Sequence, residues 1–265
     1  MADKTTSSSS VSTSTSRDQR DKIQSFVFLD LETTGLISPI QITELALISV
    51  HRKSMDDARA RWKLTPRIVD KLVLCIDPEI EVEPDAEKIT GLSRSLLRHN
   101  GKSTFNVQIC QQLEGFFKRQ EEPICLIAHN GDQYDFPILA RSLFELNDSG
   151  VGNLDLMCAD SLSAFRAVYP KKGSYKLTSL LLSTFGNTYN EHTAEDDAIG
   201  LMKLSINSWE KIRVWFEQNS TKRLQDYHTV SRSSSGALKR KRSDDNADEQ
   251  ALFMSPSAGA HPCHF

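Results

Sequence analysis

The sequence lacks any run of about 18 apolar residues, the length that a helix needs to cross a bilayer, and its N-terminus has no apolar core like that of a secretory signal. No CxxC pair occurs among its 5 cysteines, which favours a reduced, intracellular protein without structural zinc. The formal net charge is only -3, so composition alone does not indicate a nucleic-acid partner. These absences predict a soluble protein without membrane association.

The two ends of the chain have little to bury. The first 20 residues are mostly Ser and Thr, and the chain turns polar again near residue 219, so we expect both ends to be disordered. Residues 239–242 are four consecutive cations, a run typical of nuclear import or nonspecific phosphate attraction, and equally of a solvated surface. The predicted organisation is a tail at 1–23, one domain at 24–218 and a polar tail at 219–265.

Between the tails, the apolar pattern is that of an α/β protein. The region is long enough to bury one full hydrophobic core. Three early strand patterns precede an alternation of helix and strand, so we expect an α/β fold with a mixed β-sheet flanked by α-helices. The predicted strands lie within 26–36, 42–50, 67–76 and 123–130, and the predicted helices are 105–119, 136–146, 176–185 and 194–216.

The most strand-like stretch, FVFLDLETTGL at 26–36, contains two carboxylates. Residues two apart on a strand point to the same face, so Asp30 and Glu32 should lie side by side. Each then raises the pKa of the other, and both lose hydration at a cost of several kcal/mol. A cationic partner is therefore expected next to this pair.

Two further acidic motifs follow along the chain, AHNGDQYDFPIL and EHTAEDDAIGL. In the first, Asp135 comes at a helix start after a strand, where N-capping is the favoured role for the motif taken alone. In the second, His192 and Asp197 flank a helix start, and Thr193 with Asp196 also resembles a capping box. The three motifs in this order are much more specific than any one of them.

Chemistry gives the combination one natural interpretation. Carboxylate oxygens are hard ligands suited to Mg²⁺ or Mn²⁺. Two such ions about 4 Å apart stabilise the attacking and the leaving oxygen of a phosphodiester displacement. The ions neutralise the paired strand carboxylates, and His192 is placed to take a proton from the attacking water.

These motifs resemble those of the DEDDh exonucleases, which have a ribonuclease H-like mixed sheet. The segments ITELALISVHR, EKITGLSRSLL, CLIAHNGDQYDFPIL and SYKLTSLL extend the resemblance, over residues 24–216, to the three-prime repair exonuclease (TREX) family. The resemblance implies a nonprocessive 3′→5′ deoxyribonuclease. Such an enzyme releases 5′-mononucleotides and prefers single-stranded DNA or frayed 3′ ends of duplex DNA.

The resemblance also assigns roles to individual residues. It implies that Asp30, Glu32, Asp135 and Asp197 hold two Mg²⁺ ions, with Mn²⁺ as a substitute and Asp30 bridging the ions, and that His192 is the general base. Apolar contacts suit an enzyme that holds a strand end without reading its sequence. The implied substrate-binding residues are Leu31, Glu32, Thr33, Gly35, Leu36, Ile89, Asn130, Tyr134, Lys171, Lys172, Lys176 and His192.

Some of these implied contacts have plain structural alternatives. Ile89 is expected to wedge against the terminal bases, although core packing is the favoured explanation for this isoleucine taken alone. Tyr134 is expected to reach the scissile phosphate. Lys171 and its neighbours fall where the family places a phosphate-contacting segment, and a solvated loop is the alternative. Gln133 stands where some relatives carry a basic residue. The phosphate contact of that basic residue is therefore not assigned to Gln133.

The family also implies a homodimer in which edge strands pair across a two-fold axis, and residues 67–76 match that strand. Residues 51–67 lack the proline-rich insertion of some members, which removes the basis for predicting that partner surface. No apolar C-terminal segment resembles the membrane anchor of one family branch. Together with the 239–242 cluster, this favours the nucleus and cytoplasm.

Two other functions compete with a DNA exonuclease. A DEDDh 3′→5′ exoribonuclease uses the same metal chemistry, and only contacts to the 2′ position separate it from a deoxyribonuclease. An inactive nucleic-acid-binding or scaffold protein is expected to have lost a metal ligand or the base. All five positions are filled here, so this alternative ranks last.

Overall fold

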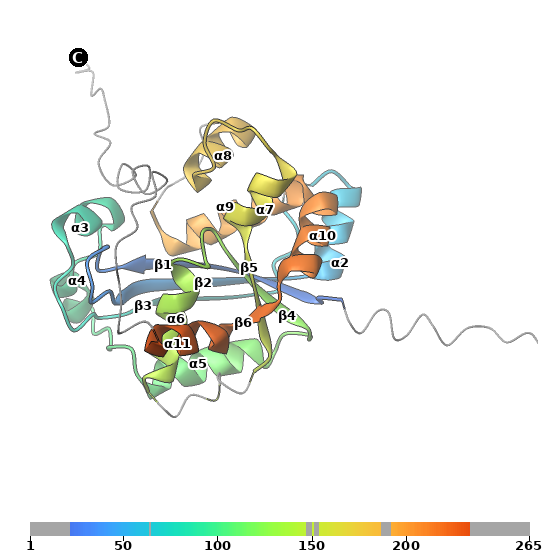
Figure 1. Cartoon of the computed structure of the whole chain (residues 1–265). Helices are drawn as coiled ribbons and strands as arrows, with labels where there is room; N and C mark the ends of the chain where they lie inside the picture. Colours follow the sequence, from blue (N-terminus) through green and yellow to red (C-terminus); the bar gives the residue numbers. More distant parts are fainter. Residues whose placement is uncertain (1–21, 64, 147–149, 151–153, 187–191, 234–265) are drawn as a thin grey trace, which may run out of the picture.

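The computed structural model of the chain describes residues 22–63, 65–146, 150, 154–186 and 192–233 (Figure 1). Most of the tail predicted at 1–23 and the basic cluster at 239–242 lie outside these residues. The predicted tail at 219–265 is described only as far as residue 233. In the part of the chain that the structure describes, no helix has the length and apolar character that would span a membrane.

Among the residues that the structure describes, six strands form one mixed sheet in the order β3-β2-β1-β4-β5-β6. The central strands β1, β4 and β5 are parallel, whereas β2, β3 and β6 are each antiparallel to their neighbours. The predicted mixed sheet is thus confirmed. The strands are β1 (Ser25–Thr33), β2 (Ile42–His51), β3 (Asp70–Cys75), β4 (Ile124–Ala128), β5 (Leu156–Asp160) and β6 (Lys222–Arg223).

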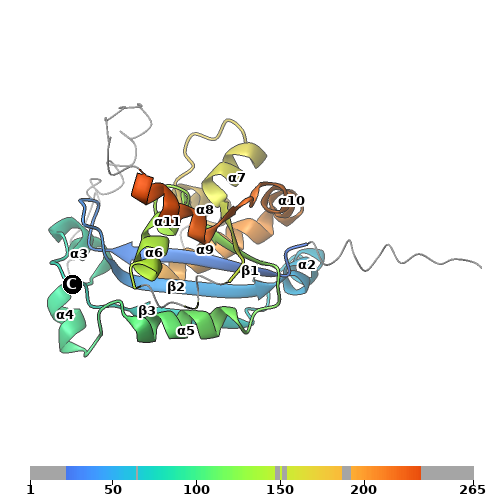
Figure 2. The same ribbon diagram turned by 60° about the horizontal axis from the view of Figure 1, so that its bottom comes forward.

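Helices cover both faces of the sheet (Figures 1 and 2). One face packs against α5 and α6, and the other against α9 and its neighbours. The helices are α2 (Arg52–Ala60), α3 (Pro84–Thr90), α4 (Arg94–His99), α5 (Val107–Phe117), α6 (Asp135–Phe144), α7 (Ser161–Val168), α8 (Leu177–Phe185), α9 (Ala194–Asn207), α10 (Trp209–Asn219) and α11 (Leu224–Ser233).

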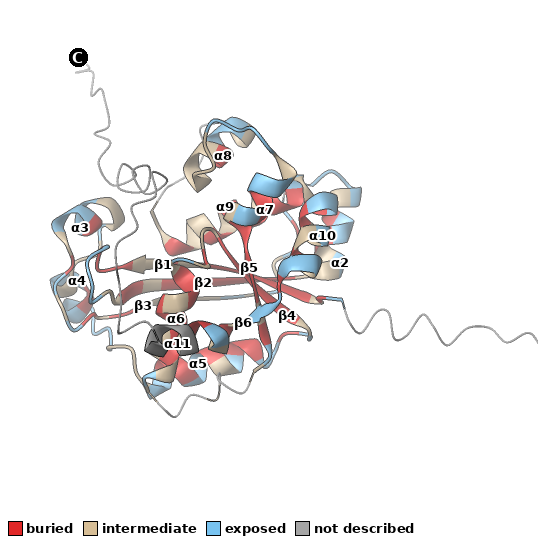
Figure 3. Cartoon of the chain, viewed as in Figure 1, coloured by how far each residue is buried: buried red, intermediate tan, exposed pale blue. Residues whose placement is uncertain are grey.

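Alternation along β1 decides which face the two strand carboxylates occupy. Val27 and Leu29 enter the core under α5 and α6, whereas Phe26 and Phe28 enter the core under α9. Buried residues therefore line both faces of the central strands (Figure 3). Asp30 continues the series of Phe26 and Phe28, so it faces α9.

The helix predicted at 194–216 is two helices, and this prediction was wrong in one respect. Ser208 leaves the helical conformation (φ -121°, ψ 22°) and separates α9 from α10. The change of direction places Trp209 against Phe26, with ring centroids 4.8 Å apart, and lets its indole N–H donate to Asp56 at 2.6 Å. The packing of buried aromatic side chains therefore decides the course of the chain here, rather than the apolar pattern that predicts one continuous helix.

The described fold continues past residue 218, where the sequence analysis places the end of the domain. Strand β6 pairs with the outer edge of β5, and α11 follows it at once and lies beside α6. The Tyr227 hydroxyl of α11 is hydrogen-bonded to Asp132, in the turn before α6. The last helix is therefore joined to the loop that carries the second acidic motif.

Candidate active site

Three carboxylates meet on the α9 face of the sheet, at the carboxyl end of β1. One oxygen each from Asp30, Glu32 and Asp197 lies within 4.8 Å of the other two. The strand supplies the first two, two residues apart, and the first turn of α9 supplies the third. The predicted pairing of the strand carboxylates and their meeting with the third motif are thus present in the structure.

Asp135 completes the set of four predicted carboxylates. It is the first residue of α6 and is 4% exposed. The N-cap position belongs to Tyr134, whose side chain makes no capping bond, so the capping alternative for Asp135 is not what the structure shows. Asp135 is not one of the three converging carboxylates, but its charge raises the pKa of Asp30.

Burial and mutual repulsion hold these acids partly protonated. Burial, followed by the charges of Asp197 and Asp135, raises the pKa of Asp30 well above its ordinary value. The same causes raise the pKa of Glu32 to about 8, and burial raises the pKa values of Asp135 and Asp197 to about 7. A cationic charge is the partner that this arrangement requires.

A second observation, which does not depend on the charge of the carboxylates, shows that these side chains fit a divalent cation. Oδ1 of Asp197 is buried, and no described residue donates a hydrogen bond to it. Buried carboxylate oxygens are normally satisfied. Hard oxygen ligands on two facing elements, with one oxygen left for an ion, suit Mg²⁺ or Mn²⁺. Asp30, Glu32, Asp135 and Asp197 are the residues that would hold the ions.

The raised pKa values predict that the metal-free protein loses stability as the pH rises. Between about pH 4 and pH 8 the folded state binds more protons at Glu32, Asp135 and Asp197 than the unfolded state, so stability falls across this window. In EDTA, we expect the melting temperature to be lower at pH 8 than at pH 5 by more than about 4 °C, a shift produced by ~1–2 kcal/mol.

Divalent cation should reverse this loss mainly at the higher pH. Added Mn²⁺ is expected to raise the melting temperature at pH 8 and to have little effect at pH 5, where protons occupy the carboxylates. Differential scanning calorimetry at both pH values checks this. A melting temperature that is unchanged by pH and by Mn²⁺ would show that the acids are not coupled to a cation.

The turn that carries the second motif is fixed from several sides. Asn130 adopts the left-handed conformation at φ 60°, and its N–H donates to Asp160 at the end of β5 (3.1 Å). A Cβ on Gly131 would lie 2.7 Å from both Ala128 and the Phe136 ring, so only glycine fits there. This close approach delivers Asp135 to the carboxyl end of β1.

His192 stands at the entrance to α9, two residues before its first residue. Its backbone is left-handed, at φ 73°, and its N–H donates a hydrogen bond to the Asp197 carboxylate. Thr193 is the N-cap, and its hydroxyl accepts the N–H of Asp196 at 3.2 Å, which is one of the two hydrogen bonds of the predicted capping box. A hydrogen bond from its own backbone thus joins His192, the predicted base, to Asp197, the predicted metal ligand of the same motif.

The predicted nucleotide-binding turn is joined to the second motif by a tyrosine. The Tyr134 hydroxyl shares a hydrogen bond with the Thr33 hydroxyl (2.6 Å) and donates to the Gly35 carbonyl (3.3 Å). In this structure the hydroxyl therefore fixes the turn after β1. Leu36 and the next residue, Ile37, are exposed beyond the turn, where apolar side chains suit stacking with bases.

Helix α3, which carries the half-buried Ile89, begins beside the same turn. Glu83, just before α3, donates its N–H to the Thr34 carbonyl (2.7 Å) and accepts the N–H of Ile37 (3.0 Å). Its carboxylate occupies the space where a Cβ on Gly35 would lie, 2.1 Å from that position, and Gly35 has φ 139°. Glu83 is not among the residues predicted from the sequence, because no local pattern ties it to a turn nearly fifty residues earlier.

The predicted basic segment is attached to the second motif by a half-buried histidine. Ring atoms of His129 lie 3.0 Å from Ser161 Oγ and 2.8 Å from the Tyr175 carbonyl oxygen. Burial lowers the pKa of His129 to about 4, so the neutral ring donates to Tyr175 and accepts from Ser161. Lys171 and Lys172 are exposed on this segment and have no described contact with the carboxylates. Lys176 occupies the N-cap position of α8, and its side chain makes no capping hydrogen bond.

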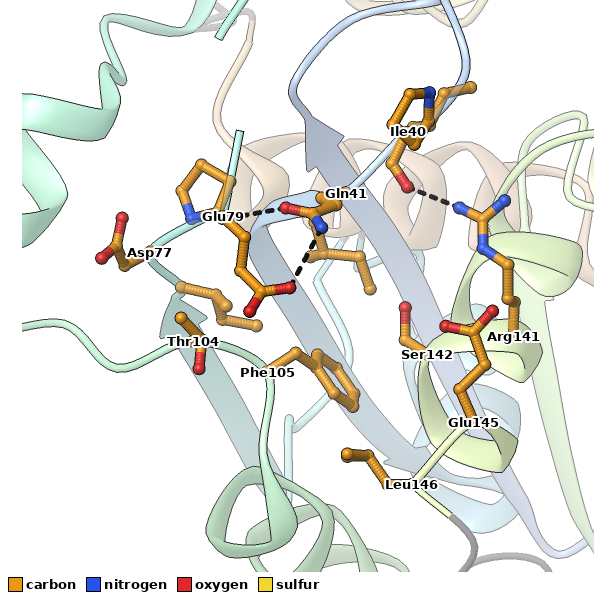
Figure 4. Close-up of a pocket in the computed structure, with 14 residues that line it drawn as sticks. Ile40, Gln41, Asp77, Glu79, Thr104, Phe105, Arg141, Ser142, Glu145 and Leu146 are labelled. Atoms are coloured by element: carbon orange, nitrogen blue, oxygen red, sulfur yellow. Dashed lines mark hydrogen bonds between the residues drawn. The ribbon is translucent and has the colours of Figure 1, made fainter. Parts of the chain in front are cut away.

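One cavity of the structure lies apart from the four carboxylates. It has a volume of about 300 Å³ and is bordered by the loop before β2, the loop after β3 and the end of α6 (Figure 4). Arg141 donates to the Ile40 carbonyl, and Gln41 is hydrogen-bonded to Glu79 at its rim. Because none of the converging carboxylates lines it, the cavity is not the candidate active site.

Comparison with known proteins relates the chain to exonucleases. The sequence model of the Exonuclease family (RNase T type) matches residues 27–205. The chain is 37% identical over 203 residues to three-prime repair exonuclease 1 of Bos taurus, covering 71% of this chain and 64% of that protein. It is 37% identical over 216 residues to three prime repair exonuclease 2 of Mus musculus, covering 75% of this chain and 89% of that protein.

Solved structures share the fold at lower identity. Exonuclease I of E. coli, in complex with a dA16 oligonucleotide, matches with a TM-score of 0.57 and 18% identity, over 72% of this chain and 42% of that one. A 3′-exonuclease that recognises the histone mRNA stem-loop matches with a TM-score of 0.54 and 14% identity, over 71% of this chain and 83% of that one.

The ribonuclease H-like sheet, the converging carboxylates and the match to the Exonuclease family model together define a 3′→5′ exonuclease of the DEDDh class. Matches to the Exonuclease family over most of the fold make the assignment more specific. The chain belongs to the three-prime repair exonuclease family.

Proposed function

We propose that this chain removes mononucleotides from the 3′ ends of DNA, preferring single strands or frayed duplex ends. The observation that carries the proposal is the convergence of Asp30, Glu32 and Asp197 within 4.8 Å, beside the buried Asp135. Family membership supports 3′→5′ exonuclease chemistry, and the fold relative with a bound dA16 oligonucleotide supports a DNA strand as substrate.

In the proposed mechanism, the four carboxylates would hold two divalent cations, Mg²⁺ by preference, which would supply stabilisation of the charge on the attacking and leaving oxygens. Asp30, Glu32, Asp135 and Asp197 hold this charge centre at the end of β1. His192 accepts the proton of the attacking water, and the new phosphate oxygen belongs to the released 5′-mononucleotide. The leaving 3′ oxygen is then protonated by solvent.

The substrate strand is proposed to lie across the turn after β1. Leu31, Thr33, Gly35 and Leu36 contact the terminal nucleotide, and Ile89 of α3 packs against its base. The hydrogen bonds of Tyr134 to this turn support a fixed nucleotide pocket. Asn130 and the lysines at 171, 172 and 176 are proposed to hold the phosphates of the strand.

A homodimer is proposed through β3. This strand is at the edge of the sheet and pairs with β2 alone among the described strands, and a second copy would satisfy its free backbone groups. Sedimentation equilibrium is expected to give twice the chain mass of 29.8 kDa. A mass of one chain at micromolar concentration would contradict the dimer. Action in the nucleus and cytoplasm is proposed from the 239–242 cluster.

The direct test is a time course on one oligonucleotide, made as DNA and as RNA and labelled at its 5′ end, with Mg²⁺ or EDTA. We expect a Mg²⁺-dependent ladder that shortens from the 3′ end on DNA. A faster ladder on RNA would favour an exoribonuclease, the second candidate, which the fold relative that recognises histone mRNA supports. Binding without any ladder would indicate an inactive nucleic-acid-binding protein.

A further inference from the structure

A fifth carboxylate, Glu44 of β2, lies beside the candidate active site. The register of the sheet sets Glu44 directly opposite Glu32 of β1, and directly opposed residues of antiparallel strands share a face. Its charge adds to those that raise the pKa values of Glu32 and Asp197. Like charges in directly opposed positions destabilise a sheet, so this glutamate requires a compensating contact.

That contact is made to the start of α9. Oε2 of Glu44 accepts the backbone N–H of Ala194 at 3.0 Å. Ala194 is the first residue of α9, and the first N–H groups of a helix have no acceptor within it. Thr193 satisfies the N–H of Asp196, so the side chain from β2 caps a different donor. Two side chains on separate elements thus cap the first turn of α9.

The capped residue lies between the two functional groups of the third motif. His192 precedes Ala194 by two residues, and Asp197 follows it by three. The His192 N–H donates to the Asp197 carboxylate, and the Asp197 N–H donates to the Thr193 carbonyl (3.0 Å). The backbone between the base and the ligand is therefore one hydrogen-bonded turn, and Glu44 attaches that turn to the sheet.

A second contact to the same turn is weaker. Nζ of Lys71, on β3, lies 2.7 Å from Oε1 of Glu195, and both side chains are partly exposed. Exposed ion pairs contribute little to position or stability. Glu44 is half-buried and accepts a backbone N–H, so it is the main attachment of the helix start.

We propose that Glu44 is a positioning residue that, through Ala194, places His192 and Asp197 over the two carboxylates of β1. The proposal rests on the proposed function, since the positioned groups are those assigned to catalysis. The proposed role requires a hydrogen-bond acceptor at the end of the Glu44 side chain, and it does not require a negative charge there. That distinction makes the glutamine and alanine substitutions informative.

The test compares Glu44→Ala with Glu44→Gln on a DNA oligonucleotide. Alanine removes the acceptor, and a misplacement of about 1 Å is expected to lower kcat by about 10²-fold with little change in KM. Glutamine keeps an acceptor oxygen and should retain most of the activity. Glu210→Ala is the matched control, because Glu210 is an exposed glutamate in the first turn of α10, and it should leave kcat unchanged.

Hydrogen exchange at the Ala194 amide, in the metal-free protein, tests the contact without activity. We expect protection in the unaltered chain and in Glu44→Gln, and fast exchange in Glu44→Ala with an unchanged fold by circular dichroism. Full kcat in Glu44→Ala would overturn the proposal, as would a Glu44→Gln variant as slow as the alanine variant. An inactive unaltered chain would instead refute the proposed function, while a protected amide would still support the contact.

Discussion

Asp197→Asn should reduce turnover on DNA by more than about 10²-fold. Loss of a residue that only hydrogen-bonds to a metal ligand costs up to about 10²-fold in activity, and Asp197 is itself a proposed ligand. The substitution keeps the shape of the side chain and removes the charge of one of the three converging oxygens. It also replaces the buried Oδ1, for which no described residue provides a donor. Steady-state rates at saturating oligonucleotide and Mg²⁺ measure the loss.

The same substitution one residue earlier provides the control. Asp196 lies in the first turn of α9, and its N–H is capped by Thr193, but it is not among the converging carboxylates. Asp196→Asn retains the capping N–H and should keep near-normal turnover. Calorimetry should show that Mn²⁺ binding weakens in Asp197→Asn only. Equal turnover in both variants would remove Asp197 from the cation site.

His192→Ala should slow the chemical step by roughly 10²–10⁴-fold, the usual contribution of a general base. The substitution leaves the backbone N–H that binds Asp197 in place, so affinity for Mn²⁺ and for DNA should change little. Single-turnover cleavage measures the step, and fluorescence anisotropy in Ca²⁺ measures DNA binding.

An exposed histidine serves as the comparison for this loss. His99 ends α4, and His99→Ala should cleave normally. Added imidazole should restore part of the rate of His192→Ala, because a free base can enter the space that the side chain leaves. Normal single-turnover cleavage by His192→Ala would show that the proton leaves the attacking water by another route.

Local patterns were sufficient to predict most of the carboxylate centre. The alternation in 26–36 gives Asp30 and Glu32 a common face, and the strand-then-helix order around Asp135 places it at the carboxyl end of the parallel strands. The capping box at Thr193 fixes where α9 begins. These features depend on residues close together in sequence.

Other features depend on contacts between distant segments, which one sequence does not reveal. Glu44 matters because the register of β2 sets it opposite Glu32, and Glu83 because the loop before α3 folds onto Gly35. Short helices such as α3 and α4 are too brief to show a periodicity. The break at Ser208 follows from the packing of Trp209, which helical spacing cannot show.

The central claim is that four carboxylates form a two-cation hydrolytic site. Anomalous diffraction at the manganese edge, from a crystal containing Mn²⁺ and a deoxynucleoside 5′-monophosphate, tests it most directly. The account predicts two peaks about 4 Å apart, bounded by Asp30, Glu32, Asp135 and Asp197, with the phosphate between His192 and the cations. No peak among these carboxylates at saturating Mn²⁺ would contradict it.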